Sequence, residues 1–316
     1  MIEYTEKIRE TARRLLEERK VDVFIGYRKG SVPMINNPVM VSDPDKVDQL
    51  YWDSNCGLNL CNYLTKRTDR IGILANGCNS RNIVTHVVEN QISREQLYIV
   101  GIPCTGMIDH RAVQSAVNHR EISDIQEDGD RFVVKGKDFE ETFSKGDFLQ
   151  ANCAVCKNFN PVEYDEMIAD PVKELEGVDV YGDVDEIEKM GPEERWELFA
   201  RTVSRCIRCY ACRNACPLCY CPTCFVDESQ PQWVGKSTDP TDTMTFHLLR
   251  AYHCAGRCTD CGACERACPL DIPVRRFTKK LNKDTLELFS WEAGLSLDQR
   301  PPLDVYRQDD YNDFIR

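Results

Sequence analysis

Short apolar runs and helical patterns alternate in the first half of the chain. Residues 70–75 and 97–102 are typical of buried strands, and residues 80–90 between them have helical spacing. A strand, a helix and a second strand within about thirty residues form a βαβ unit, whose two strands must be parallel. Shorter apolar runs at 21–27 and 38–41 predict two further strands. We therefore predict an α/β amino-terminal domain with a partly parallel sheet.

The pattern changes after residue 160. An acidic stretch broken by glycine and proline is typical of a solvated connector. A helix then begins at Pro192, with proline in its first turn and acidic residues near the positive end of its dipole. Residues 241–253 predict another helix. The expected organisation is an α/β domain over 1–160, an acidic connector over 161–192, a mainly helical domain over 193–290 and an extended tail over 291–316.

Composition excludes several classes of function. With 40 Lys and Arg against 52 Asp and Glu, the net charge is −12, which argues against binding to nucleic acid or to an anionic membrane. No apolar run approaches the 18 residues of a membrane span. The charged amino terminus does not have the pattern of a secretory signal. We expect a cytoplasmic protein, whose cysteines stay reduced and are able to bind metal.

Cysteine is the residue that points to chemistry. The chain has 18 cysteines, and twelve of them lie between Cys206 and Cys268. Two runs have the spacing C-x2-C-x2-C-x3-C-P, in which three thiolates hold one 4Fe-4S cluster and the fourth cysteine ligates the other cluster. Structural zinc sites use isolated C-x2-C pairs and fit these triple runs poorly. The pattern predicts one cluster on Cys206, Cys209, Cys212 and Cys268, and another on Cys258, Cys261, Cys264 and Cys216.

The two cysteine runs and the predicted helix between them resemble a known type of domain. Over residues 195–285 the chain resembles the helical dicluster ferredoxin domain of heterodisulfide reductase and succinate dehydrogenase iron–sulfur subunits. A cluster whose four irons all carry thiolates has no open site for a substrate. The resemblance and the full ligation therefore favour electron transfer over catalysis.

A second resemblance concerns the first half of the chain. The segment 101–107 (GIPCTGM), followed by 153–157 (CAVCK), resembles the β subunits of coenzyme F420 hydrogenases and formate dehydrogenases. The resemblance implies a further 4Fe-4S cluster on Cys104, Cys153 and Cys156.

One ligand of that family's cluster has no counterpart, because residues 105–152 contain no cysteine. Cys78 is the proposed substitute. The βαβ unit places it and Cys104 at the carboxyl edge of strands about 5 Å apart, where open α/β sheets bind ligands. Each could instead be a small buried apolar residue. In the alternative for the C-x2-C pair, Cys153 and Cys156 form a zinc site with Cys221 and Cys224.

The same family binds FAD, but the glycine motifs for a nucleotide are missing. The family's Gly-Gly segment and any G-x-G-x-x-G are absent, and the Walker-like spacing from Gly72 to Gly77 continues with Cys78 and Asn79 in place of Lys and Ser/Thr. The turn that follows could hold an anion with Arg81, or could be an ordinary helix start capped by Asn79 or Ser80. FAD is therefore compatible with the resemblance and unsupported by any motif.

Six cysteines lie outside these assignments: Cys56, Cys61, Cys219, Cys221, Cys224 and Cys254. Cys219, Cys221 and Cys224 are candidates for a fourth metal centre completed by Cys56 or Cys61. Alternatively, some of the six are free thiols that shield the clusters.

These patterns lead to one main functional prediction. We expect an electron-transfer subunit of an anaerobic multi-subunit oxidoreductase of the heterodisulfide reductase, formate dehydrogenase or hydrogenase type, with three or more 4Fe-4S clusters. Its partner would be a flavoprotein or a metal-bearing catalytic subunit, and the tail aromatics Tyr306, Tyr311 and Phe314 suit an arm on that partner or a frayed terminus. The alternatives are a flavin-dependent F420 oxidoreductase β subunit and a zinc-stapled structural subunit. No pattern for hydrolytic chemistry is present.

Overall fold

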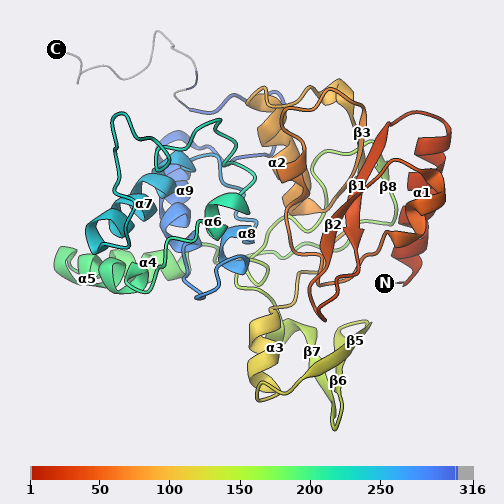
Figure 1. The fold of residues 1–316 in the computed structure, drawn as a ribbon, viewed down its shortest axis with the longest axis horizontal. Helices are drawn as coiled ribbons and strands as arrows, with labels where there is room; N and C mark the ends of the chain where they lie inside the picture. Colours follow the sequence, from red (N-terminus) through yellow and green to blue (C-terminus); the bar gives the residue numbers. More distant parts are fainter. Residues whose placement is uncertain (1, 303, 305–316) are drawn as a thin grey trace.

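The main sheet has five strands in the order β2-β1-β3-β4-β8 (Figure 1). The computed structural model describes residues 2–302 and 304. β2 pairs with β1 in the antiparallel sense, and β1, β3, β4 and β8 run parallel. The prediction of an α/β domain with a partly parallel sheet is therefore confirmed. The strands are β1 (Val23–Arg28), β2 (Asn37–Val41), β3 (Ile71–Ala75), β4 (Leu97–Gly101) and β8 (Glu166–Met167).

The predicted βαβ unit consists of β3, α2 (Gly77–Val88) and β4. Every residue of β3 is buried, as expected for a central strand covered on both faces. Figure 1 shows α1 (Ile2–Glu17) on one side of the sheet and α2 on the other. α2 begins earlier than the apolar pattern indicates, because the side chain of Asn76 caps it by accepting a hydrogen bond from Asn79 N over 3.0 Å. The prediction of a cap from Asn79 or Ser80 was wrong.

A small antiparallel sheet, which the sequence analysis did not predict, lies between Cys104 and Cys153. β5, β6 and β7 form it, and with α3 they enclose a separate apolar core around Phe132. In Figure 1 this unit projects below the main sheet. It returns the chain from the end of β4, where Cys104 lies, to Cys153 and Cys156, the other cysteines of the predicted third set. The bounds are α3 (His110–Ala116), β5 (Ile122–Asp128), β6 (Arg131–Gly136) and β7 (Glu140–Ser144).

The acidic stretch predicted as a solvated connector takes part in the fold. β8 adds an edge strand to β4, and α4 (Gly182–Glu188) packs against α9 (Arg275–Phe289). Lys279 Nζ lies 2.5 Å from Asp183 Oδ1, and Lys283 Nζ lies 2.7 Å from Asp185 Oδ1. The acidic residues are therefore counter-charges for a basic helix, a long-range pairing that local composition does not reveal.

The C-terminal part carries the two cysteine runs. Its longer helices are α5 (Pro192–Val203), α7 (Pro240–His253) and α9, and the short α6 (Ala211–Asn214) and α8 (Ala263–Arg266) each follow the start of one cysteine run. The helices predicted from Pro192 and over 241–253 are both present. Within the described residues, no helix is long and apolar enough to cross a membrane.

The chain after α9 lies against the amino-terminal domain. The guanidinium of Arg81 on α2 donates to the carbonyl oxygen of Ala293 over 2.6 Å, and Arg300 Nη1 donates to the carbonyl oxygen of Val88 over 3.1 Å. These two contacts hold the beginning of the predicted tail on α2. Tyr306, Tyr311 and Phe314 lie outside the described residues.

Candidate metal centres

The two cysteine runs have nearly the same backbone. Arg208 and Asp260 have left-handed φ values of 53° and 58°, and Tyr210 and Gly262, two residues later, have φ values of 59° and 72°. Each pair is followed by a four-residue helix, α6 or α8, and these two helices contact each other. The repeated spacing in the sequence therefore corresponds to a repeated local structure.

Backbone N–H groups donate to the first sulfur of each run. Arg208 N lies 3.3 Å from Cys206 Sγ, and Asp260 N lies 3.4 Å from Cys258 Sγ. Such donors stabilise the charged thiolate, which is the form that binds metal. The local structure thus suits sulfur ligands of a cluster.

The structure gathers the first tetrad from both runs. Cys212 and Cys268 are buried in one apolar cluster, and Cys206 packs against it. Burial raises the pKa of the Cys206 thiol, and the neighbouring Cys209 and Cys268 raise it further. Cys268, the last cysteine of the second run, therefore lies with the cysteines of the first run, as the crossed pattern predicts.

The second tetrad also combines cysteines from both runs. Cys216, from the first run, lines one cavity together with Cys258, Cys261 and Cys264. Burial raises the pKa of the Cys264 thiol to about 12. A free thiol at this position would stay protonated, so an ionised ligand here depends on positive charge supplied by bound iron. The donor set, four thiols around a buried cavity, fits a 4Fe-4S cluster.

The third predicted set also meets at one cavity. Cys78, Cys104, Cys153 and Cys156 all line it, and Cys78 lies in the first turn of α2 instead of the preceding loop. β3 and β4 pair directly, with Ala75 opposite Gly101, which brings the two chain segments that follow the strands together.

The cavity of the third set has the same kind of sulfur environment. Gly106 N lies 3.3 Å from Cys104 Sγ, and Met107 N lies 3.4 Å from Cys153 Sγ. Burial raises the pKa of Cys104 to about 11 and that of Cys156 to about 12. The residues present therefore fit a buried cluster in this cavity as well.

Adjoining cavities connect the second and third sets. Cys261 lines both the cavity of Cys78 and Cys104 and the cavity of Cys216 and Cys258. A single residue therefore forms part of the wall between two candidate clusters. Sequence spacing gives no signal for this adjacency, because it depends on how the two halves of the chain pack.

The remaining cysteines do not all lie where the sequence suggests. Cys219 lies with Cys216 and Cys254, and their three sulfur atoms are within 4.8 Å of one another. Cys221 is exposed, and Cys224 packs against the apolar cluster of the first tetrad.

The two remaining amino-terminal cysteines belong to the core of the first domain. Cys61 is fully buried there, and its thiol donates to the carbonyl oxygen of Asn79 over 3.3 Å. Cys56 is also in this core, where it lines the cavity of the third set. Cys254 is the thiol that sequence reasoning left without a role. The sequence offered one signal for such a role: Cys254 follows the predicted helix directly and stands four residues before Cys258, the first cysteine of the second run.

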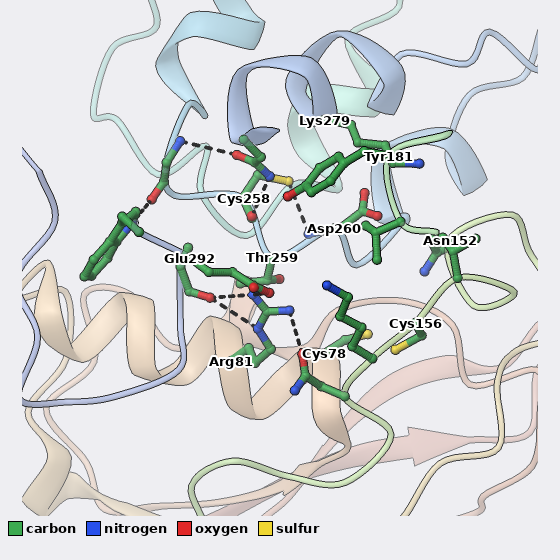
Figure 2. A pocket seen from close by; sticks show the side chains of 18 residues that line it. Cys78, Arg81, Asn152, Cys156, Tyr181, Cys258, Thr259, Asp260, Lys279 and Glu292 are labelled. Carbon is green, nitrogen blue, oxygen red and sulfur yellow. Dashed lines mark hydrogen bonds and ion pairs between the residues drawn. The ribbon is translucent and has the colours of Figure 1, made fainter. Parts of the chain in front are cut away.

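A surface pocket lies between the second and third sets. Figure 2 shows Cys78 and Cys156 on one side of it and Cys258 on the other. Arg81 also lines the pocket, but its donors are taken by Asn158 Oδ1, Glu292 Oε1 and the carbonyl oxygen of Ala293. These contacts make Arg81 a structural residue, and the predicted alternative of an anion site on Arg81 is not supported.

These features are those of an iron–sulfur protein, and the comparison with known families agrees for the carboxyl-terminal part of the chain. Residues 202–272 match the family model described as a 4Fe-4S dicluster domain. The two tetrads derived from the cysteine spacing are drawn entirely from this segment.

The whole chain is similar to particular subunits. It is 22% identical over 350 residues to the F420-dependent formate dehydrogenase subunit beta of Methanocaldococcus jannaschii, covering 92% of this chain and 91% of that protein. It is 23% identical over 354 residues to the F420-dependent formate dehydrogenase 1 subunit beta of Methanococcus maripaludis, covering 91% and 90%. The resemblance to these β subunits, predicted from sequence, is confirmed.

A solved structure is also similar in part. It belongs to the F420-reducing [NiFe] hydrogenase complex from Methanosarcina barkeri, with a TM-score of 0.39 and 18% sequence identity. The match covers 50% of this chain and 62% of that chain.

Proposed function

We propose that this chain relays single electrons through three 4Fe-4S clusters as a subunit of a multi-subunit oxidoreductase. The observation that carries the proposal is the gathering of three cysteine sets: the first at a buried apolar cluster, and the second and third around two cavities that share Cys261. When bound, the clusters would supply reversible one-electron chemistry. The protein's part is to hold them close together and away from water.

Individual residues have distinct roles in this proposal. Cys206, Cys209, Cys212 and Cys268 would hold the first cluster, Cys216, Cys258, Cys261 and Cys264 the second, and Cys78, Cys104, Cys153 and Cys156 the third. Backbone N–H groups stabilise the thiolates, and a buried arginine, Arg250, lies among the thiols of the first two sets. We assign the helices α5–α9 to the dicluster region and residues 1–160 to the third cluster.

The free thiols and the similar proteins support inferences about the location of this chain and its partners. All eighteen cysteines are free thiols, the form that persists in a reducing compartment, so we infer a cytoplasmic location. The similar proteins are named as β subunits of F420-dependent formate dehydrogenases, and we infer a comparable partner: a flavoprotein or metal-bearing subunit. The pocket of Figure 2, between Cys78 and Cys258, is where we expect electrons to be exchanged with a small carrier.

The position of this pocket also supports a second candidate function, a flavin-dependent F420 oxidoreductase. A flavin in the pocket would lie beside the thiols of two clusters. The two functions differ in one observable, tightly bound FAD, because only the second requires it. Acid extraction of the anaerobic protein, followed by chromatography of the supernatant, distinguishes them.

The test of the main proposal is a cluster count on the complete chain purified without oxygen. We expect about twelve irons and twelve sulfides per chain, since three cubes contain four of each. The variant Cys78→Ala should retain about eight irons, and Cys206→Ala should lose a different paramagnetic signal from the reduced protein. Stoichiometric zinc with negligible sulfide would overturn the proposal and support the structural alternative.

A further inference from the structure

The cavity of the second tetrad is surrounded by more thiols than a cube requires. Besides Cys216, Cys258, Cys261 and Cys264, it is lined by Cys254, which is 2% exposed. Four thiolates complete the ligation of a 4Fe-4S cluster. The fifth thiol therefore requires a separate explanation.

The spacing of the sulfurs shows where the excess lies. The Sγ atoms of Cys216, Cys219 and Cys254 lie within 4.8 Å of one another. Sulfurs about 2.3 Å from one tetrahedral metal atom are roughly 3.8 Å apart. The ligands of a cube bind four separate irons and therefore stand farther apart than ligands of one atom. The three thiols are thus close enough together for more than one of them to reach the same metal atom.

The backbone fixes this gathering. The N–H group of Cys258 donates to the carbonyl oxygen of Cys254 over 3.0 Å, and that of Cys219 donates to the carbonyl oxygen of Cys216 over 3.1 Å. Cys254 and Cys219, the two thiols beyond the tetrad, are therefore each fixed by a backbone hydrogen bond to a predicted ligand of the second cluster. Cys254 is also the C-cap of α7, so it comes from a different element than Cys216.

A buried charge favours a thiolate among these cysteines. Arg250 lies one helical turn before Cys254 and is 5% exposed. Its side chain lines the same cavity as Cys216 and Cys254. A cation in this position compensates one thiolate, whichever of the two cysteines carries it.

We propose that Cys216 and Cys254 are exchangeable ligands of one iron of the second cluster. In the exchange, the bond from iron to Cys216 Sγ breaks as the bond to Cys254 Sγ forms. The proton of the Cys254 thiol passes to Cys216, directly or through Cys219, so neither charge nor electron count changes. This inference rests on the proposed function. It assigns a ligand role to Cys254, which lies outside both cysteine runs and for which their spacing predicts no role.

The experiment compares iron content and Mössbauer spectra of the complete chain and three variants. We expect Cys216→Ala and Cys254→Ala to retain about twelve irons each, with every iron of the second cluster still bound to sulfur ligands only. The double variant Cys216→Ala/Cys254→Ala should lose either four irons or the all-sulfur signature of one iron. Cys61→Ala, which removes a buried thiol outside the cysteine sets, serves as the control and should match the wild type.

The outcomes separate the two proposals. If Cys216→Ala alone gives the spectrum and iron content of the double variant, Cys254 is not a ligand and the exchange is overturned. If the double variant keeps the wild-type spectrum, neither cysteine is a ligand and the exchange is also overturned. A wild-type chain without iron and sulfide would instead overturn the proposed function itself.

Discussion

Arg250 Nη2 donates a hydrogen bond to the carbonyl oxygen of Cys212 over 3.1 Å, and this contact holds a buried cation between the two C-terminal tetrads. Burial alone would lower the pKa of Arg250, but the surrounding thiols, Cys264 foremost and then Cys216, outweigh burial and raise it. The guanidinium therefore remains charged next to sites that are expected to gain and lose electrons.

Replacement of this cation should lower the reduction potentials of both C-terminal clusters. A nearby positive charge favours the reduced state, and a unit charge about 6 Å away at an effective dielectric constant of about 20 contributes roughly 3 kcal/mol, or about 130 mV for one electron. We expect Arg250→Met to shift both midpoints downward in redox titrations followed by paramagnetic resonance. Arg276→Met, which removes a half-exposed arginine paired with Asp183, is the matched control. Unchanged midpoints in Arg250→Met would contradict the role of the cation.

Arg266 should act on the third cluster in a similar way. Its side chain lines the cavity of the third set, and within the described residues its Nε and Nη1 are buried without a hydrogen-bond partner, whereas Nη2 donates to Gln150. Hydrogen bonds to charged groups are worth about 1.5–3 kcal/mol, which corresponds to roughly 65–130 mV for one electron. We expect Arg266→Gln to lower the third midpoint by that amount. Arg266→Lys, which keeps the charge, should lower the third midpoint less than Arg266→Gln does. Equal shifts of the midpoints of all three clusters would contradict a local effect of Arg266.

Gly77 should be essential for the third cluster for steric reasons. A Cβ at this position would lie 1.9 Å from the carbonyl oxygen of Asn158, so an alanine must push the segment that contains Cys156 away from α2. We expect Gly77→Ala to lose about four irons, measured by iron analysis of the anaerobic protein. Gly146→Ala has room, because the nearest atom is 3.9 Å away, and should keep the wild-type iron content. A full complement of iron in Gly77→Ala would show that the two segments can separate without loss of the site.

His247 should make stability depend on pH. Burial, together with the nearby charges of Arg250 and Arg208, lowers its pKa to about 4, whereas the unfolded chain binds this proton near pH 6.5. As the pH falls from 6.5 to 4, the unfolded state gains a proton that the folded state does not, so the free energy of unfolding decreases by about 1.4 kcal/mol per pH unit.

The variant His247→Phe removes this titration and keeps an aromatic ring beside Phe246 and Phe277. In anaerobic denaturant titrations between pH 7.5 and 4.5, the wild type should lose stability relative to His247→Phe by up to roughly 3 kcal/mol. Parallel pH profiles for the two proteins would show that folding does not lower the pKa of His247.

Much of this molecule follows from short-range sequence patterns. The runs that begin at Cys206 and Cys258 specify clusters, because a cube takes closely spaced thiolates and each run folds around its own N–H···S contacts. The βαβ unit was also predictable, because buried parallel strands appear as continuous apolar runs. The acidic stretch was misread because its partners, the lysines of α9, lie about a hundred residues away.

The sequence by itself determined which cysteines belong to the dicluster runs and that β3 and β4 run parallel, because both depend on residues that are near one another in the chain. Only the tertiary structure decided that Cys261 stands in the wall of two cavities and that Cys254 lies against Cys216. Those relationships arise from packing between distant segments, where the distance between two thiols depends on how whole helices and strands are placed and not on their spacing in sequence.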